Sequence, residues 1–532
     1  MLTALYDTPL LQTPEKPAII FNGRRLTYAE LDEMVPRSAA ALAGLGVGRG
    51  DRVALFMGNR PELPILDMAC FAMGAVAVPL NSRFQVDEVV HACVKSSPRV
   101  LIADADRRAK VAGVQDRAPS LEHVFILDGG EASGPVKGDG DGAAAAGATA
   151  AASSGDASTR PWSEALAAAP NGMETSVHCE SDHPALIMFT SGSTGKPKGV
   201  THTHGSILAH LRSRVETQRL ESSDVTLIGS LVCHVAGSMG MTFPTLHAGG
   251  SVVLLEAFEP EVWLDAVAEH RPTRALLLPT QMLDALEHEA VEHVDFGSFR
   301  EIEVGGSVVT HHLRTLFRET TGHDLREVYG LTECEGACLQ RYWEPAKIGS
   351  VGKPREGVDI RLVDKDGADV GIGEIGEIWL SSESIMAGYW EDPEHTAAAF
   401  SERWFRTGDL ARRDEDDHIH FVGRDKEMII KGGSNIAPDE IEEVLDDHPD
   451  VECSAVVGVP DARMGELIHA FVEIKPGSRG TVEVSQLRDC LADHVAEYKV
   501  PDRWTILDAL PRNQVGKLDY AALHAMAARP AD

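Results

Sequence analysis

The stretch FTSGSTGKPKGV, Phe189–Val200, combines glycine, hydroxyl and lysine side chains in a pattern that suits phosphate oxygens. Backbone N–H groups of a glycine-rich turn can surround an anion, and nearby hydroxyl and ammonium groups add donors and charge. A flexible Gly/Ser linker would account for the glycines but not for the K-P-K-G ending. We therefore predict a phosphate-binding loop whose donors and charges come from Ser191, Ser193, Thr194, Lys196 and Lys198.

The spacing within this loop excludes a Walker A motif, which needs G-x-x-x-x-G-K followed by Ser or Thr. Gly192 and Gly195 enclose only two residues, and Lys196 is followed by Pro197. The apolar run ALIM before the loop is typical of a buried strand, and HGSILAHLRSRVETQRL after it is typical of a helix. We expect the loop to connect a strand to a helix.

Three other patterns do not support a site. GIGEIG precedes the strand-like run EIWL instead of opening a helix, so it predicts a hairpin turn and not a dinucleotide loop. HEAVEH spaces His288 and His293 five residues apart, whereas a zinc-protease helix needs four. The eight cysteines contain no C-x-x-C pair, which favours a reduced, cytoplasmic protein over a disulfide or metal framework.

The elements that would position the loop alternate between strand and helix patterns. Strand-like runs such as RVALFM, AVAVPL, SVVLLE and ALLLP are interleaved with helical stretches such as EVWLDAVAEH. This alternation predicts an α/β fold. The most apolar window, Leu63–Leu80, contains Asp67 and two prolines, which predicts a buried helix followed by a strand and not a membrane span.

Two changes in composition divide the chain. Residues 129–159 hold almost no large apolar side chain, so we predict a flexible surface insertion there. After Gly423 the pattern becomes helix, strand, strand, helix, which predicts a small α+β domain. We place an N-terminal domain at residues 1–425 and a C-terminal domain at residues 426–532.

Composition narrows the class of protein further. The 532 residues carry a formal net charge of −33, which argues against a nucleic-acid partner because duplex binding needs a basic footprint. The first residues, MLTALYDTPLLQTPEKP, lack the basic segment of a signal peptide. A content of 43% hydrophobic and 25% charged residues is typical of a soluble globular enzyme.

The opening loop closely resembles the signature of the AMP-forming adenylating superfamily, which includes the acyl-CoA synthetases. Other motifs of that superfamily follow in order: YGLTE at Tyr329–Glu333, RWFRTGDL at Arg403–Leu410, GRDKEMIIKGGSNIAPDEIEEVL, and LPRNQVGKL with Lys517. The resemblance covers nearly the whole chain apart from residues 129–159. It implies a large multi-sheet N-terminal domain of the acyl-adenylate-forming type and a small, mobile α+β C-terminal domain.

The resemblance also implies a two-step reaction. A carboxylate attacks the α-phosphorus of ATP to give acyl-AMP and pyrophosphate, and a thiol then displaces AMP. Because an anion must approach a polyanion, cations and oriented donors have to neutralise both. The implied substrates and cofactors are a carboxylic acid, ATP, Mg²⁺ and CoA.

Roles for the phosphate-binding residues follow from the same resemblance. Thr332 would contact the α-phosphate, and Glu333 would bind Mg²⁺; taken alone, Glu333 could equally be a charge at a helix N-terminus. The β- and γ-phosphates would be held by Thr190, Ser191, Gly192, Ser193, Thr194, Gly195, Lys196 and Lys198.

The adenosine site would be built from a second group of residues. Tyr329 would stack on adenine beside the turn formed by Gly305, Gly306 and Ser307. Asp409 would accept hydrogen bonds from both ribose hydroxyls, and Arg424 would support the same ribose.

Lys517 matches the adenylation lysine of the superfamily and would bridge the attacking carboxylate and the α-phosphate. Asn513 stands where the commonest pattern has Thr. The match to the hinge residue is Lys426, about which the C-terminal domain would rotate for the second step. That rotation would bring Lys431, Gly432 and Gly433 towards the pantetheine arm of CoA.

CHVAGSMGMTF matches the acyl-pocket motif, with His234 as its histidine. The pocket residues would be Ala236, Gly237, Ser238, Met239 and Gly330. The stretch contains no Arg or Lys to pair with a second carboxylate, which disfavours a dicarboxylate such as malonate. We predict a medium- or long-chain fatty acid, with an aryl acid as the alternative.

The acceptor is predicted to be CoA, because the hinge and the Lys431-Gly432-Gly433 segment are present and no carrier domain follows Lys517. One alternative is a ligase that loads a separate carrier protein. A second is a nucleotide-binding regulator on the same fold, although such a protein would be expected to have lost Glu333 or Lys517. The sequence does not determine whether the protein forms a homodimer or how long the chain of the acid is.

Overall fold

The computed structural model describes residues 5, 7–127, 159–170, 175–190, 197–306, 309–424, 427–431, 434–461, 464–492, 494–495, 497–513 and 516–528. The chain divides into two units. Unit 1 comprises residues 1–215, 220–257 and 384–393, and unit 2 comprises residues 216–219, 258–383 and 394–532. The predicted insertion, apart from Thr159, and both residues at the predicted boundary 425/426 lie outside the described residues.

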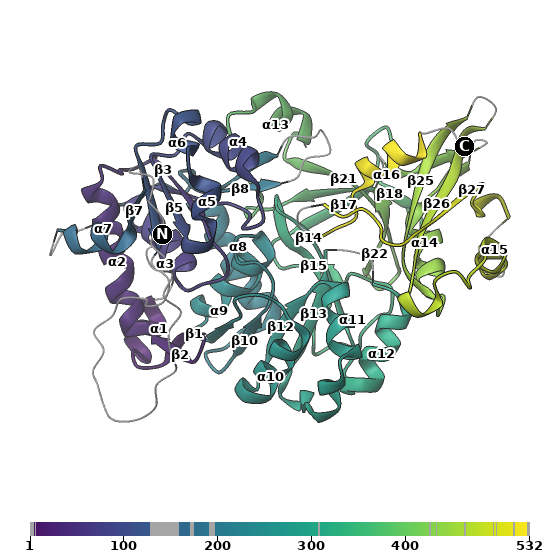
Figure 1. Cartoon of the computed structure of the whole chain (residues 1–532), viewed down its shortest axis with the longest axis horizontal. Coiled ribbons are helices and arrows are strands. Elements are labelled where there is room, and N and C mark those ends of the chain that lie inside the picture. The colour runs from purple at the N-terminus through teal and green to yellow at the C-terminus, as the bar shows by residue number, and fades with distance from the viewer. Residues whose placement is uncertain are drawn as a thin grey trace. The chain divides into compact units, whose positions relative to one another are not determined.

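Unit 1 contains an eight-stranded sheet (Figure 1). Its strands are β3 (Arg52–Phe56), β4 (Val76–Pro79), β5 (Val100–Asp104), β6 (His123–Leu127), β7 (Thr159–Pro161), β8 (Pro184–Thr190), β9 (Lys198–Thr203) and β19 (Gly388–Tyr389). They lie in the order β19-β9-β8-β4-β3-β5-β6-β7. Strands β3 to β8 pair in parallel, whereas β9 and β19 are antiparallel to their neighbours.

Helices link the parallel strands of this sheet. They are α3 (Glu62–Met73), α4 (Val86–Ser96), α5 (Arg108–Val111), α6 (Val114–Arg117) and α7 (Trp162–Ala168), and α2 (Tyr28–Gly44) precedes the first strand, β3. Almost every residue of α3 is buried, and β4 and β5 are buried throughout. Continuous burial is expected of parallel strands that are covered on both faces, which is why these strands show no alternation of polar and apolar residues.

A second set of strands in unit 1 carries the predicted acid pocket. It consists of β1 (Pro17–Phe21), β2 (Arg24–Thr27), β10 (Val225–Ile228) and β11 (Ser251–Leu254), with β10, β11 and β1 parallel and β2 antiparallel. The helices of this part are α1 (Asp7–Gln12), α8 (His204–Gln218) and α9 (Phe243–His247). A π-helix at Ala236–Thr242 leads directly into α9.

Unit 2 begins with strands β12 (Arg274–Leu277), β13 (Glu301–Gly305), β14 (Arg326–Leu331), β15 (Cys334–Leu339) and β16 (Lys353–Pro354). The first three are parallel and the last two are antiparallel. The accompanying helices are α10 (Pro260–His270), α11 (Pro279–Glu287) and α12 (His311–Thr321). Helix α12 begins where Thr310 caps the amide of Leu313 and ends at Gly322, whose φ of 72° suits a residue without a Cβ.

A five-stranded antiparallel sheet follows in unit 2. Its strands are β17 (Asp359–Val363), β18 (Ile375–Ser381), β20 (Phe400–Ser401), β21 (Trp404–Arg413) and β22 (Ile419–Arg424), and α13 (Pro393–Ala399) precedes β20. GIGEIG forms the turn that leads into β18, with Gly373 at φ 82°. The prediction of a turn rather than a dinucleotide loop is confirmed.

The C-terminal part of unit 2 is the predicted α+β arrangement. Its strands are β23 (Ile429–Lys431), β24 (Ser434–Ile436), β25 (Val451–Asp461), β26 (Gly465–Ile474) and β27 (Arg503–Leu507), and its helices are α14 (Pro438–Asp446), α15 (Val484–Ala492) and α16 (Tyr520–Ala527). The predicted order of helix, strand, strand and helix is present as α14, β25, β26 and α15. Buried Ile and Val side chains of β25 and β26 pack against Ile441, Leu445, Leu487 and Leu491.

One prediction about the opening loop is wrong. The loop does not connect a strand to a helix: it joins β8 to β9 as an antiparallel hairpin, in which Thr190 pairs with Lys198, and α8 starts only after β9. The run VTHT, with its β-branched residues, continues as strand because β9 pairs with β8 over six residue pairs, four of them within VTHT. The glycine-rich segment therefore connects two paired antiparallel strands, and its residues 191–196 lie outside the described residues.

Candidate active site

The described part of unit 2 brings Tyr329, Asp409 and Arg424 together. Asp409 on β21 lies opposite Arg424 on β22 in the antiparallel ladder, so the register of these strands sets their separation. The hydroxyl of Tyr329 donates to Asp409 Oδ2 at 2.6 Å, and Arg424 Nε lies 3.1 Å from Asp409 Oδ1. All three are residues that the resemblance assigns to the adenosine site.

Burial controls the ionisation of this group. It raises the pKa of Tyr329 well above its usual value, and the charge of Asp409 raises it further, so Tyr329 stays a hydrogen-bond donor. Burial also raises the pKa of Asp409, while Arg424 and the Tyr329 hydroxyl lower it. Asp409 is 5% exposed and Tyr329 8% exposed. A buried carboxylate supported in this way can accept hydrogen bonds from a diol.

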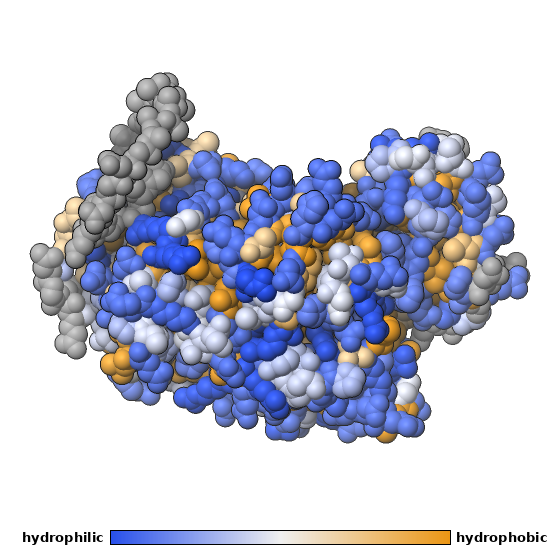
Figure 2. Space-filling model, turned by 90° about the horizontal axis from the view of Figure 1, so that it is seen from below, coloured by the Kyte–Doolittle hydropathy of each residue, from blue (hydrophilic) through white to orange (hydrophobic). Residues whose placement is uncertain are grey.

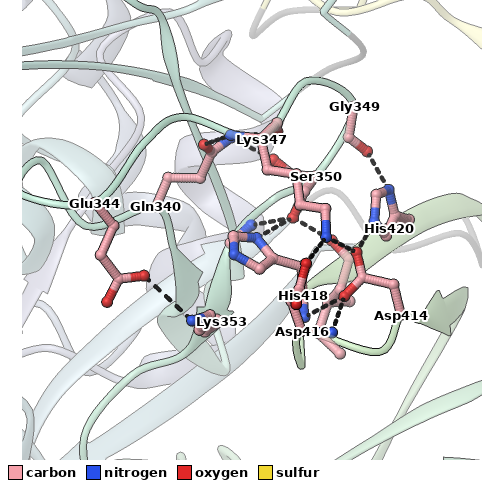
Figure 3. A network of polar contacts seen from close by, with 12 residues as sticks. Gln340, Glu344, Lys347, Gly349, Ser350, Lys353, Asp414, Asp416, His418 and His420 are labelled. Carbon is pink, nitrogen blue, oxygen red and sulfur yellow. Dashed lines mark hydrogen bonds and ion pairs between the residues drawn. The ribbon is translucent and has the colours of Figure 1, made fainter. Parts of the chain in front are cut away.

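A polar network holds the β21–β22 hairpin at its other end (Figure 3). Lys347 Nζ contacts Asp414 at 2.7 Å and Asp416 at 2.6 Å, and His420 Nε2 lies 2.7 Å from Asp414. Burial alone would raise the pKa of Asp414, but the hydrogen bonds from Lys347 and His420 outweigh burial and lower it. The network fixes the turn between β21 and β22, and with it the strands that carry Asp409 and Arg424.

The same network ties that turn to the loop after β15. Ser350 Oγ lies 3.0 Å from His418 Nδ1 and donates to the carbonyl of Ile419 at 3.0 Å (Figure 3). Gln340 donates to the carbonyl of Ser350 at 2.6 Å and accepts from the amide of Lys347 at 2.9 Å. These contacts join two segments of unit 2 that are far apart in the sequence.

Gly305 and Gly306 end β13, and both require a small residue. A Cβ on Gly305 would lie 2.5 Å from Val328 Cγ1 and 2.7 Å from the Val328 carbonyl oxygen. Gly306 has a φ of +83°, which L side chains rarely adopt. Ser307, the third residue of the predicted turn, lies outside the described residues.

Lys517 lies beside this turn, because a Cβ on Gly306 would be 3.7 Å from Lys517 Nζ. Lys517 is solvent-exposed as a residue, yet protein atoms crowd its ammonium, and this partial desolvation lowers its pKa. Arg424 lowers the pKa further, and Asp409 raises it. The sequence predicted that a lysine more than one hundred residues from YGLTE would share its site, and unit 2 has this arrangement.

Asn513, the departure from the commonest superfamily pattern, shapes the loop that carries Lys517. Asn513 Oδ1 accepts from the amide of Lys517 at 3.1 Å, and the amide of Asn513 donates to the Lys517 carbonyl at 2.7 Å. Gly516 closes the turn with a φ of 83°. The amide side chain therefore supports the lysine backbone directly.

Thr332 and Glu333 form the two-residue turn between β14 and β15, in which Leu331 pairs with Cys334. The alternative reading of Glu333 as a charge at a helix N-terminus is wrong, because a hairpin and not a helix follows YGL. Glu333 is close enough to Arg424 to raise the pKa of that guanidinium, together with Asp409 and Glu427 and against the effect of burial.

Other predicted residues are placed only in part. Thr190 ends β8 and Lys198 begins β9, with Lys198 Nζ 5.1 Å from the ring of Tyr389. Lys431 ends β23, and its Nζ lies 2.8 Å from Asp502. The predicted residues that lie outside the described ones are Ser191, Gly192, Ser193, Thr194, Gly195, Lys196, Lys426, Gly432 and Gly433.

The predicted acid-pocket segment of unit 1 is a π-helix that begins two residues after His234. Gly237 touches the preceding loop: a Cβ there would lie 2.4 Å from the carbonyl oxygen of Leu231. Asn59, 2% exposed, accepts from the amide of Val232 at 2.8 Å and donates to the carbonyl of Ser230 at 2.8 Å. Gly330, also predicted for the pocket, is an exposed residue of β14 in unit 2.

Sequence reasoning missed two residues next to this segment. Within unit 1, His210 Nε2 lies 2.8 Å from the carbonyl oxygen of Met239, and Arg214 donates to the carbonyl of Gly240 at 3.0 Å. Both side chains are fully buried. The motif itself contains no Arg, but the cation of Arg214 lies behind it. A His and an Arg four positions apart on a predicted helix were the available signal.

Among the described residues no cluster of three or more His, Cys, Asp or Glu could hold a metal ion. Each of the eight cysteines is a free thiol. No helix in the described part of the chain is both long and apolar enough to cross a membrane.

The class of protein is shown by comparison with known families. Residues 7–390 match the family described as AMP-binding enzyme, and residues 440–517 match the AMP-binding enzyme C-terminal domain. The chain belongs to this family, as the motifs predicted. It is an AMP-forming acid–thiol ligase and binds ATP.

Three curated relatives align over almost their whole length. A feruloyl-CoA synthase from Amycolatopsis sp. is 35% identical, covering 95% of each chain. An indoleacetate–CoA ligase from Aromatoleum aromaticum is 33% identical, covering 97% of this chain and 96% of the relative. A long-chain-fatty-acid–CoA ligase from Mycobacterium tuberculosis is 30% identical, covering 96% and 94%.

The fold is also that of a solved adenylate-forming structure. ATP-bound MatB from Rhodopseudomonas palustris superimposes with a TM-score of 0.86 at 28% identity, covering 99% of this chain and 98% of that one. The predicted fold class is therefore confirmed.

Proposed function

We propose that this ligase activates a large, apolar monocarboxylic acid and transfers it to CoA, releasing AMP and pyrophosphate. The observation that carries the proposal is the cluster in unit 2, where Tyr329 donates to the carboxylate of Asp409, Asp409 raises the pKa of Lys517, and the Lys517 ammonium lies beside Gly306. Asp409 and Tyr329 suit the binding of a nucleoside. The ammonium of Lys517 suits bond formation at the α-phosphate of the nucleotide.

The first step follows from these charges. Asp409 holds the ribose, which orients the α-phosphate with respect to Lys517. The ammonium of Lys517 attracts both the incoming carboxylate and the α-phosphate oxygen, and so lowers the repulsion between two anions. The resemblance assigns the grip on the leaving pyrophosphate to the segment from Thr190 to Lys198. Mg²⁺ would be held by Glu333 and the phosphates, where it neutralises developing charge.

In the second step a thiol has to take the position beside the acyl group that Lys517 holds in the first step. The resemblance supports Lys426 as the hinge for this exchange and Lys431-Gly432-Gly433 as the segment that meets CoA. The domain limits 1–425 and 426–532 belong to the same proposal. The names of the relatives favour CoA as acceptor over a carrier protein.

For the acid, the names of the two more similar relatives favour an aryl acid, which reverses the order predicted from the sequence. A medium- or long-chain fatty acid is the second candidate, supported by the name of the third relative. The apolar wall with Met239 and Met241 suits both.

The experiment is a screen of acids with ATP and CoA, read as AMP release. Ferulate, indoleacetate and octanoate should exceed acetate and malonate in kcat/KM by about tenfold or more, because each buried methylene or ring carbon adds transition-state binding. A preference for acetate or malonate would overturn the proposal of a large, apolar acid. Replacing CoA with a phosphopantetheinylated carrier protein tests the acceptor. Faster transfer to the carrier protein would overturn the proposal that CoA is the acceptor.

A further inference from the structure

In the π-helix that forms the predicted pocket wall, a proline removes an amide donor that backbone carbonyls would otherwise use. In a π-helix the carbonyl of residue i accepts from the amide of residue i+5, and in an α-helix from that of residue i+4. For Met239 the i+5 residue is Pro244, and for Gly240 the i+4 residue is also Pro244. Proline has no N–H, so it removes the π-type donor of one carbonyl and the α-type donor of the other.

Side chains from another helix donate to these same two carbonyls. The His210 ring, at 2.8 Å from the Met239 oxygen, must carry its proton on Nε2, since a carbonyl oxygen can only accept. Arg214 donates to the Gly240 oxygen at 3.0 Å through Nη2. His210 and Arg214 are four positions apart on α8 and therefore face the same side of that helix.

Three other carbonyls in this part of the chain accept hydrogen bonds from groups of the same segment. Phe243 donates its amide to the Ser238 carbonyl, Ser238 Oγ donates to the His234 carbonyl at 2.9 Å, and Thr242 Oγ1 donates to the Gly237 carbonyl at 2.7 Å. One backbone amide and two local hydroxyls thus serve the carbonyls of Ser238, His234 and Gly237, whereas the two carbonyls affected by Pro244 receive bonds from α8. A buried carbonyl left without a donor is costly, so each of these contacts has an energetic reason.

We propose that His210 and Arg214 are positioning residues that fix the course of the Ala236–Thr242 backbone and thereby set which acid the pocket prefers. They act through the Met239 and Gly240 carbonyls and touch neither nucleotide nor reacting atoms. This inference rests on the proposed function, because it takes the π-helix as a wall of the acid site.

The test uses the whole protein with two acids, ferulate and octanoate, and pyrophosphate release as the readout. Arg214→Met and His210→Leu remove the donors with little change in volume. Each should raise KM for the preferred acid and change the ratio of kcat/KM between the two acids, both by about fivefold or more, with KM for ATP changed less than about twofold. The matched variants Arg214→Lys and His210→Gln keep a donor near the same place and should stay closer to the wild type.

Pro244→Ala provides an independent check. It restores the π-type amide donor of the Met239 carbonyl, so Pro244→Ala combined with His210→Leu should recover at least about half of the lost selectivity, a non-additive result in a double-mutant cycle. Effects that add independently would overturn the proposal. An unchanged acid ratio in active Arg214→Met and His210→Leu variants would also overturn it. If one of the two fails to fold, the test rests on the other, whose unchanged acid ratio would overturn the proposal.

The failure of the proposed function would look different. Wild-type protein that releases no pyrophosphate in response to any acid in the screen would refute acid activation itself. Wild-type protein that is active on the acids, with variants of unaltered preference, would refute only the role of His210 and Arg214.

Discussion

Lys517 has two features that suit a group serving one step and leaving before the next. It is exposed on a short turn, its backbone is held by Asn513, and its ammonium lies near Gly306. Crowding and the charge of Arg424 lower its pKa, so it gives up its proton more readily than a free lysine. A flexible point charge in this setting can be removed without breaking a buried ion pair.

Lys517→Ala should abolish acyl-adenylate formation, by at least about a thousandfold, because it removes the cation between two anions. Formation of the thioester from supplied acyl-AMP should be little changed. Pyrophosphate exchange measures the first half and CoA consumption the second; an equal loss of both would contradict the role. Lys517→Arg keeps the charge and serves as the control.

The same residue predicts a pH dependence. Because the pKa of Lys517 is lowered, its charged form is lost at a lower pH than that of an ordinary lysine. Adenylation should therefore fall as pH rises through that lowered pKa, whereas thioester formation from supplied acyl-AMP should lack this limb. Both profiles come from the two assays just described.

At the level of elements, strand register and tight turns position the site. Asp409 and Arg424 meet because β21 and β22 pair at that register, and the Lys347–Asp414 network fixes the turn between the strands. The π-helix depends on close backbone contact at Gly237. A single Cβ there would collide with backbone atoms, which cannot move aside as a flexible side chain can.

Gly237→Ala should lower thermal stability by about 1–3 kcal/mol and reduce activity with every acid, since its Cβ would lie 2.4 Å from the Leu231 oxygen. Differential scanning calorimetry and AMP release measure the two effects. Gly477→Ala is the control, because a Cβ at Gly477 meets nothing within 4 Å. Unaltered melting and activity of Gly237→Ala would contradict the packing argument.

These elements also explain which predictions the sequence could support. Motif residues such as Tyr329, Asp409 and Lys517 were predictable, because the chemistry limits both residue type and order. The hairpin at the phosphate loop was missed because KGVTHT becomes a strand only through pairing with β8. His210 and Arg214 were missed because their partners are carbonyl groups of another element, and their i, i+4 spacing on a helix does not identify those partners.

At the level of the whole molecule, charge is the dominant property. The formal net charge is −33, and hydrophilic residues cover most of the face shown in Figure 2. The proposed substrates ATP and CoA are anions, so the acidic surface does not attract them at long range. The cations Arg424, Lys198 and Lys517 must therefore act locally, at distances shorter than the Debye length of about 8 Å at physiological salt.

Acidic residues also make the stability of the C-terminal part depend on pH. Burial raises the pKa of Asp446 to about 7, and its Oδ1 is shielded from solvent without a hydrogen-bond partner. The folded state therefore holds a proton that the unfolded state releases near pH 4. Stability falls as pH rises from about 4 to about 7 and stays reduced above that range.

Asp446→Asn should raise the melting temperature at pH 8 and reduce the gain in stability seen between pH 8 and pH 6. Thermal unfolding at the two pH values provides the measurement. Glu452→Gln removes a charge from an exposed position nearby and controls for the general loss of negative charge. An equal response of the two variants would show that burial of Asp446 is not the cause.

The separation of the pocket wall from its supports on α8 has a consequence for how the enzyme can be re-engineered. Libraries directed at Ala236–Thr242 must preserve Gly237 and the hydroxyls that bond within that segment. Libraries directed at positions 210 and 214 can shift the same backbone while every side chain of the wall stays as it is. Related enzymes could diverge in substrate by the same route, with mutations that a comparison of pocket residues alone would overlook.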